Sequence, residues 1–321
     1  MSGRALVTGA AGFVGQHLAR RLREEGWQVA GTVQAGVAPG DTPLLDAAAR
    51  AAIRWLPLDL LSSASVDAAV EQAQPDVVFH LAAQSSVGAS HADPLATWEV
   101  NATGTLRLAL ALRRGGAARR LLLVSSAEVY GRVPAEAQPI TEAHPVRPVN
   151  PYGASKAAAE LAALQVAAQG ELEVVIARSF NHTGPGQDVR FALPSFALQL
   201  ARMRRGEAEP VLHVGNLQVR RDMADVRDVV TAYLLLATRG ENGGVFNVCT
   251  GEAPPLRALV ERLVALSGVA ARIEVDPSRL RAVETPLLLG CASRLRALGW
   301  APRIPLDRTL ADLLESVEAE A

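Results

Sequence analysis

The sequence predicts an α/β fold in which a doubly wound parallel sheet is followed by a smaller α/β lobe. Short apolar runs alternate with helical segments through the first 180 residues, and a glycine-rich turn follows the first run. After Gly184 the alternation breaks into shorter pieces rich in proline and arginine. Such alternation is typical of a parallel sheet with helices on both faces. We therefore expect a sheet domain over residues 1–180, to which later segments return, and a mainly substrate-binding lobe over residues 181–321.

Six runs rich in leucine and β-branched residues predict the strands of the sheet. The expected strands are Arg4–Thr8, Gln28–Val33, Ile53–Leu56, Val77–His80, Leu121–Ser125 and Val174–Arg178. Between them, apolar residues at helical spacing, such as Val14, Leu18 and Leu22, predict helices. Asp93 and Asn150 each precede a proline, which is the pattern of a helix N-cap followed by proline in the first turn.

The second lobe is expected to contain four helices. Apolar residues recur there at helical spacing in four segments, which predict the helices Leu193–Arg204, Val226–Thr238, Leu256–Ser267 and Leu306–Val317.

Composition narrows the class of protein. The 32 basic and 33 acidic residues nearly balance, so bulk charge does not favour binding to nucleic acid or to a membrane surface. The apolar runs, such as Leu121 to Val124 and Leu234 to Ala237, are far short of the ~20 residues needed to span a bilayer. The first strand starts at Arg4, which leaves no room for a signal peptide. Two cysteines, Cys249 and Cys291, are interpreted as buried thiols in a reducing cytosol. We expect a cytoplasmic protein without a metal site.

A glycine-rich turn follows the first strand and opens a helix. Gly9, Gly12 and Gly15 are spaced G-x-x-G-x-x-G. Glycines there permit a tight turn and a close approach of a pyrophosphate, and the helix N-terminus presents N–H donors. Glycines at strand–helix turns also occur for steric reasons alone. The position after the first strand favours a dinucleotide site, and hence a Rossmann-type sheet.

The type of dinucleotide stays open. The second strand ends at Gln34, which is neither the acidic residue typical of NAD binding nor the arginine typical of NADP binding. Asp59, after the third strand, is placed either to contact the adenine amino group or to cap the following helix. Both NADPH and NADH remain candidates.

Lys156 is the only lysine among the 32 basic residues, and it comes four residues after Tyr152, one of three tyrosines. The two side chains should lie on one face of a helix. We expect the ammonium to lower the pKa of the phenol from about 10 toward neutrality, and to hold ribose hydroxyls. Ser126, at the end of the fifth strand, either donates a hydrogen bond to a substrate carbonyl or is only a turn or capping residue.

These motifs resemble the extended branch of the short-chain dehydrogenase/reductase superfamily. The resemblance rests on TGAAGFVG at 8–15, HLAAQSSV at 80–87, the strand that ends at Ser126, and YGASK at 152–156, and it spans essentially the whole chain. It implies that Ser126, Tyr152 and Lys156 are catalytic and that Asn101 is structural or relays protons. The residues implied to bind the cofactor are Gly9, Gly12, Phe13, Val14 and Gly15 at the pyrophosphate, Asp59 and Leu60 at the adenine, and Leu81, Ala82, Ala83, Tyr152 and Lys156 at the ribose and nicotinamide.

Later segments resemble the GDP-4-keto-6-deoxy-D-mannose reductases. They are RSFNHTGPGQ at 178–187, RRDMADVRD at 220–228, RLRAVE at 279–284, FNVCTGE at 246–252 and GWAPRIPL at 299–306. The arginines and carboxylates at 220–228 are equally consistent with solvated surface ion pairs. The resemblance implies that Asn181, Arg221, Arg281 and Glu284 contact GDP and that Ser126 contacts the sugar. The implied reaction is NAD(P)H-dependent reduction of the C4 ketone, to GDP-D-rhamnose or GDP-6-deoxy-D-talose.

Other functions stay open at this point. A GDP-mannose 4,6-dehydratase takes an extra acid or base from the segment after the catalytic serine, where this chain has Glu128. In a reductase, Glu128 is equally interpreted as a structural or sugar-binding carboxylate. A nucleotide-sugar epimerase or another sugar reductase is a further alternative. A non-enzymatic NAD(P)-binding protein typically lacks the tyrosine or the lysine, and both are present. The superfamily resemblance also implies a homodimer formed through two helices, here Leu95–Arg113 and Tyr152–Gln169.

Overall fold

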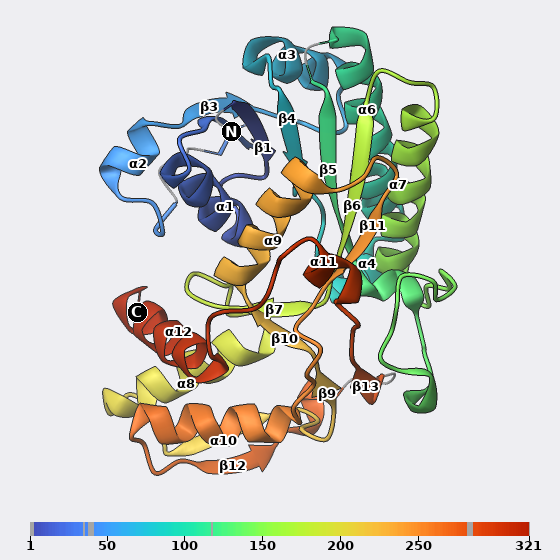
Figure 1. Ribbon diagram of the computed structural model, residues 1–321. Coiled ribbons are helices and arrows are strands. Elements are labelled where there is room, and N and C mark those ends of the chain that lie inside the picture. Colours follow the sequence, from blue (N-terminus) through green and yellow to red (C-terminus); the bar gives the residue numbers. More distant parts are fainter. Residues whose placement is uncertain (1–2, 35, 38–41, 117, 281–284, 321) are drawn as a thin grey trace.

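A seven-stranded parallel sheet forms the centre of the computed structural model, which describes residues 3–34, 36–37, 42–116, 118–280 and 285–320 (Figure 1). In sheet order its strands are β11 (Val245–Val248), β6 (Glu173–Ser179), β5 (Arg120–Ser126), β4 (Val77–His80), β1 (Arg4–Thr8), β2 (Gln28–Val33) and β3 (Arg54–Pro57). The six strands predicted from the sequence are confirmed to within one residue at either end. The seventh, β11, comes from the second half of the chain and pairs in parallel with β6.

Helices cover both faces of the sheet. One face is packed by α1 (Phe13–Glu24) and α9 (Val226–Arg239), and the other by α3 (Ser63–Ala73), α6 (Gly104–Gly115) and α7 (Pro151–Ala167). The prediction that 226–238 belongs to the smaller lobe was wrong, because α9 packs along α1 and against β5 and β6. Its apolar side chains, such as Tyr233 and Leu236, are fully buried there.

Short helical segments connect these elements. They are α2 (Ala47–Ala51), α4 (Val87–Ala92), α5 (Pro94–Trp98), the π-helix η1 (Glu99–Thr103), and the 3₁₀-helices η2 (Ala127–Tyr130) and η3 (Ala135–Ala137). The predicted N-caps are confirmed: Asp93 accepts a hydrogen bond from the backbone of Ala96, and Asn150 from that of Gly153. The helix predicted over 95–113 is instead three consecutive pieces, α5, η1 and α6.

The smaller lobe has a core of its own. It is formed by α8 (Ala192–Arg204), α10 (Leu256–Ser267) and α12 (Leu306–Glu320), with the strand pair β8 (Val211–Val214) and β12 (Arg272–Val275). Leu200, Leu212 and Leu313 are fully buried between these elements. In Figure 1 the lobe lies below the sheet, on the side where β6 leads into β7.

Two small parallel strand pairs complete the structure. They are β7 (Asn181–Thr183) with β10 (Met223–Asp225), and β9 (Arg220–Arg221) with β13 (Leu287–Leu288); the remaining segments are η4 (Pro277–Arg279) and α11 (Ser293–Ala297). Both cysteines are free: Cys249 is buried as predicted, and Cys291 is only half-buried. Within the described ranges, no helix combines the length and apolar character that crossing a bilayer requires.

Candidate active site

The predicted cofactor and catalytic residues gather at the carboxyl edge of the sheet. The glycine turn follows β1, Leu81 to Ala83 follow β4, and Ser126 ends β5. In the sheet, β1 lies between β2 and β4, so the chain winds in opposite directions on its two sides. Open α/β sheets bind their ligands at such a switch point.

Close backbone packing explains the glycines of the turn. Gly9 has φ +71°, and a Cβ there would lie 3.1 Å from the backbone nitrogen of Ala82. A Cβ on Gly15 would lie 2.2 Å from the carbonyl oxygen of Gly9. Gly12 is the N-cap of α1 and supplies no capping side chain. The turn therefore has the shape that lets a pyrophosphate approach the N-terminus of α1.

His80 ties this turn to the end of β4. Thr8 Oγ1 accepts hydrogen bonds from the backbone N–H groups of Leu81 and Ala82, both at 3.1 Å, and lies 2.7 Å from Nδ1 of His80. Since the Thr8 oxygen already accepts twice, its proton is donated to His80. Burial, with a smaller contribution from the charge of Lys156, lowers the pKa of His80 to about 3. The imidazole is therefore neutral at physiological pH.

The same histidine extends the network toward the catalytic helix. His80 Nε2 lies 3.0 Å from Thr105 Oγ1, which donates to the carbonyl of Asn101 at 2.6 Å. The amide of Asn101 donates to Ser155 Oγ at 3.0 Å, and Ser155 donates to the carbonyl of Tyr152 at 2.8 Å. A continuous set of buried hydrogen bonds thus joins the cofactor turn to the first turn of α7.

Asn101 lies within the π-helix η1, a local widening of the kind often found at functional sites. Its side chain accepts from the backbone N–H of Gln84 at 2.8 Å and donates to the carbonyl of Gln84 at 3.0 Å. Asn101 therefore fixes the segment after β4, which includes the predicted ribose-binding residues. This geometry fits the structural role that the resemblance implied.

Tyr152 is half-buried in the first turn of α7, beside Ser126. The prediction that its pKa is lowered was wrong. Burial raises the pKa of Tyr152 to about 12, the hydrogen bond with Ser126 opposes the rise, and the charge of Glu128 adds to it. The phenol is therefore protonated at neutral pH, so in this state it can donate a proton. Ser126 Oγ also accepts from the backbone N–H of Glu128 at 3.2 Å, so it caps η2 as well.

Lys156 lies one turn further along α7 and is 4% exposed. Burial lowers the pKa of its ammonium to about 8, and the carboxylate of Glu160 opposes this effect. Among the residues that the structure describes, none accepts a hydrogen bond from this ammonium. Its charge acts on His80, which lies against Thr8 at the start of the glycine turn. A buried cation without an acceptor at this position fits the ribose hydroxyls of a dinucleotide.

Glu128 is half-buried and is tied to the start of α7. Asn150 Nδ2 donates to Oε2 of Glu128 at 2.8 Å, while Oδ1 of the same asparagine caps the helix. Glu128 thus joins the segment after Ser126 to the first turn that carries Tyr152.

Asp59 does not cap the following helix, so that alternative was wrong. Its carboxylate accepts from the backbone N–H of Leu61 at 2.9 Å, and Ser62 is the N-cap of α3. Leu60 is buried, and a Cβ on Gly104 would lie 2.9 Å from its side chain. Both predicted adenine-binding residues therefore lie in a fixed turn after β3.

The predicted GDP-binding residues are only partly described. Asn181 opens β7 and pairs in register with Met223, two residues after Arg221 of β9, so these two residues lie in neighbouring segments. Arg221 donates to the carbonyl of Arg220 at 2.9 Å. The two other predicted contacts, Arg281 and Glu284, lie outside the described residues.

Aromatic contacts join the cofactor turn to the segment after β6. The ring of Phe13 stacks on His182 with centroids 6.2 Å apart, and meets His17 edge-on at 5.6 Å. His17 Nε2 lies 3.0 Å from the carbonyl oxygen of Pro185. The predicted cofactor and substrate segments are thus in direct contact. Sequence reasoning missed this because 168 residues separate His17 from Pro185.

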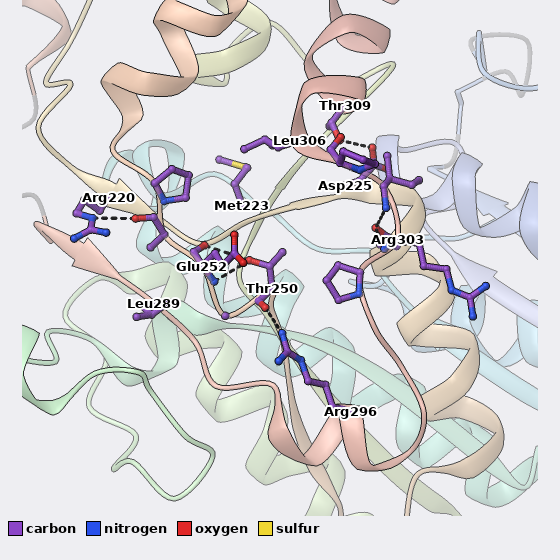
Figure 2. Close-up of a pocket in the computed structure, with 17 residues that line it drawn as sticks. Arg220, Met223, Asp225, Thr250, Glu252, Leu289, Arg296, Arg303, Leu306 and Thr309 are labelled. Carbon is purple, nitrogen blue, oxygen red and sulfur yellow. Dashed lines mark hydrogen bonds between the residues drawn. The ribbon is translucent and has the colours of Figure 1, made fainter.

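A cavity of about 720 Å³ lies behind β9, apart from this site. Figure 2 shows Arg220, Arg296 and Arg303 around it, with Glu252 between them. It is lined by neither Tyr152 nor any other predicted catalytic residue. Arg220 lines it and Arg221 does not, as expected for neighbours that point to opposite faces of a strand. In the described part of the chain, no group of three His, Cys, Asp or Glu side chains is placed to hold a metal ion.

The switch point of the sheet, with its serine, tyrosine and lysine, defines a nicotinamide-dependent oxidoreductase of the extended short-chain dehydrogenase/reductase type. The model of the family described as GDP-mannose 4,6 dehydratase matches residues 6–313. The chain belongs to this family.

Known relatives match this chain over nearly its full length. A GDP-6-deoxy-D-mannose reductase from Pseudomonas aeruginosa is 39% identical over 99% of this chain and 98% of its own. The solved structure of RMD from Pseudomonas aeruginosa complexed with NADPH has a TM-score of 0.84 at 36% identity, and covers 99% of this chain and 100% of that one. A UDP-glucose 4-epimerase from Thermus thermophilus, in complex with NAD, has a TM-score of 0.87 at 29% identity, with full coverage of both chains (100% each).

Proposed function

We propose that the protein reduces the C4 ketone of GDP-4-keto-6-deoxy-D-mannose to a GDP-6-deoxyhexose with NADPH or NADH. The observation that carries the proposal is the pairing of Ser126 with Tyr152, whose raised pKa keeps the phenol protonated and able to donate. Reduction of a ketone needs a proton donor at its oxygen, whereas oxidation of an alcohol needs a base there. The identity to a GDP-6-deoxy-D-mannose reductase supports the choice of sugar and nucleotide.

Each residue of the site has its own role in the proposed reduction. When bound, the reduced nicotinamide supplies the hydride that adds to C4. Tyr152 gives its proton to the oxygen at C4 as the carbon–oxygen π bond breaks, so that an alcohol forms. Ser126 donates a hydrogen bond to the same oxygen and stabilises its developing charge. The Lys156 ammonium, one helical turn away, stabilises the phenolate that remains and binds the ribose hydroxyls.

We assign the cofactor's pyrophosphate to the turn from Gly9 to Gly15, including the backbones of Phe13 and Val14. Asp59 and Leu60 then face the adenine, and Leu81 to Ala83 the ribose. The GDP part of the substrate is assigned to Asn181 and Arg221, together with Arg281 and Glu284. The contact between Phe13 and His182 supports this arrangement, because it joins the cofactor and substrate segments.

The contacts of Glu128 favour a reductase over a dehydratase. An acid or base that eliminates water across C5–C6 must be able to reach the sugar. The carboxylate of Glu128 is instead bonded to Asn150, the N-cap of the helix that carries Tyr152. We therefore assign Glu128 to the support of that helix.

We further propose a cytoplasmic homodimer. Leu95 and Trp98 of α5 and Leu161 of α7 are exposed at 81%, 45% and 71%, and the two helices pack side by side. Covering these side chains with a second copy would remove apolar surface from water. Both free thiols suit a reducing compartment. Sedimentation of the wild type and of Leu161→Asp tests the dimer: a monomeric wild type contradicts it.

The activity is tested with two substrate mixtures. Purified protein receives GDP-mannose alone, or GDP-4-keto-6-deoxy-D-mannose with NADPH or NADH, and cofactor absorbance and sugar products are followed. Cofactor oxidation with formation of a GDP-6-deoxyhexose, only in the second mixture, is expected. Conversion of GDP-mannose without added reductant would identify a dehydratase and contradict the proposal.

A further inference from the structure

A buried ion pair lies one helical turn beyond Lys156. Glu160 and Arg178 are 3% and 6% exposed. Arg178 Nε donates to both oxygens of Glu160, at 3.0 and 3.2 Å, and its terminal nitrogen donates at 2.6 Å. The hydroxyl of Ser125 donates to the same carboxylate. Taking two charges out of water is costly, and an apolar pair of similar size is often no less stable. Stability alone is therefore a weak reason for this ion pair.

Glu160 extends the catalytic face of α7. Tyr152, Lys156 and Glu160 follow one another at intervals of four residues, so they share one face of the helix. Because both Lys156 and Glu160 are buried, little water separates their charges, and the attraction between them is screened less than at the surface.

Among the other titratable groups on the elements near α7 that the structure describes, none supplies a negative charge that acts on Lys156. His80, from β4, is neutral and buried. Tyr152 is protonated at neutral pH. Tyr130, from η2, is likewise protonated, with Arg178 stacked 4.9 Å from the centre of its ring. The charge of Glu128 raises the pKa of Tyr152, and its carboxylate accepts a hydrogen bond from Asn150. Glu160 is the carboxylate that opposes the effect of burial on Lys156.

We propose that Glu160 is a positioning residue for catalysis: its carboxylate, fixed by Arg178, keeps the Lys156 side chain charged and directed along the face that carries Tyr152. The arginine orients the carboxylate through a two-pronged contact. Arg178 is presented by β6, whereas Lys156 and Glu160 both belong to α7. The inference rests on the proposed reductase only for its effect on turnover.

The single lysine makes the test direct. Selective ¹³C labelling at the ε-carbon of lysine gives one side-chain resonance, that of Lys156, whose pH titration reports its pKa in the full-length protein. Glu160→Gln is expected to lower that pKa by about one unit or more, since a neighbouring opposite charge favours the ionised form. Ser125→Ala, which keeps both charges, is the matched control and should leave the pKa within about 0.3 units of the wild-type value. An unchanged pKa in Glu160→Gln would overturn the proposal.

A second variant covers the case in which Glu160→Gln does not fold, because that change leaves the Arg178 charge buried without a partner. Glu160→Gln with Arg178→Met removes both charges. It is still expected to lower the Lys156 pKa, because Glu160 shares the helix face of the lysine and is the charged group that shifts its pKa, whereas Arg178 is presented by β6. A wild-type pKa in the double variant overturns the proposal.

Measurements of turnover then separate the role of Glu160 from the proposed reductase activity. In the pH profile of cofactor oxidation, the alkaline limb should move to lower pH by the same shift as the resonance, with KM for the ketosugar unchanged. A shifted resonance without any ketosugar reduction by the wild type would leave the role of Glu160 standing and contradict the proposed reductase. A shifted limb with an unshifted resonance would contradict the role of Glu160.

Discussion

Arg178→Met tests how much the buried ion pair of Glu160 and Arg178 contributes to the free energy of unfolding. The change leaves the carboxylate of Glu160 buried with only Ser125 as a hydrogen-bond donor. Breaking a buried pair by removing one partner costs about 3–5 kcal/mol. For a chain of 321 residues, 1 kcal/mol corresponds to roughly 1.5 °C in melting temperature. The apparent Tm should therefore fall by about 5–8 °C.

The matched control is Arg262→Met. Arg262 makes an ion pair with Asp307, but the two side chains are 59% and 48% exposed, and such pairs contribute little to stability. Both variants and the wild type are compared at neutral pH by differential scanning calorimetry, at one protein concentration. An Arg178→Met variant that melts within about 1 °C of the control would refute the reasoning that the pair carries a buried charge.

Two further predictions concern the cofactor turn and its buried histidine. Gly15→Ala would place a methyl group against the Gly9 carbonyl, so the turn must shift; we expect cofactor affinity to fall by about tenfold or more in a fluorescence titration. Gly115→Ala, whose nearest contact is at 3.5 Å, is the control, and equal affinities in the two variants would contradict the close-packing argument. Burial lowers the pKa of His80 from 6.5 to about 3 in the folded state. As the pH falls below 6.5, the unfolded state therefore binds a proton at His80 while the folded state does not, and the free energy of unfolding decreases. Urea unfolding at about pH 7 and about pH 5 should therefore show a larger loss of stability in the wild type than in His80→Asn, and equal losses would argue against a buried neutral imidazole.

The sheet was predictable because its strands are buried on both faces and read as uninterrupted apolar runs. Leu121, Leu122 and Leu123 of β5 are all fully buried, and no helical pattern competes with that run. The strands β7, β9, β10 and β13 are two or three residues long, too short to give a periodic signal. Periodicity also identified α9 as a helix, but it cannot tell which layer a helix packs on.

The candidate site was likewise predictable from the sequence only in part. Spacing placed Tyr152 and Lys156 on one helix face, and the glycine spacing located the turn. The pKa of Tyr152 was predicted in the wrong direction, because the sequence shows the nearby charge of Lys156 but not the degree of burial, which dominates. The network through His80 and Asn101 joins segments far apart in the chain. Glu160 was the one missed residue with a local signal, since it repeats the four-residue interval after Lys156.

The central claim is that Tyr152 donates the proton in reduction of a GDP-linked ketosugar. Tyr152→Phe removes that proton while it keeps the ring in place. General-acid catalysis contributes about 10²–10⁴-fold, so the rate of cofactor oxidation with GDP-4-keto-6-deoxy-D-mannose should fall by about that factor. Cofactor affinity should stay close to that of the wild type. A variant that reduces the ketosugar at the wild-type rate would contradict the account.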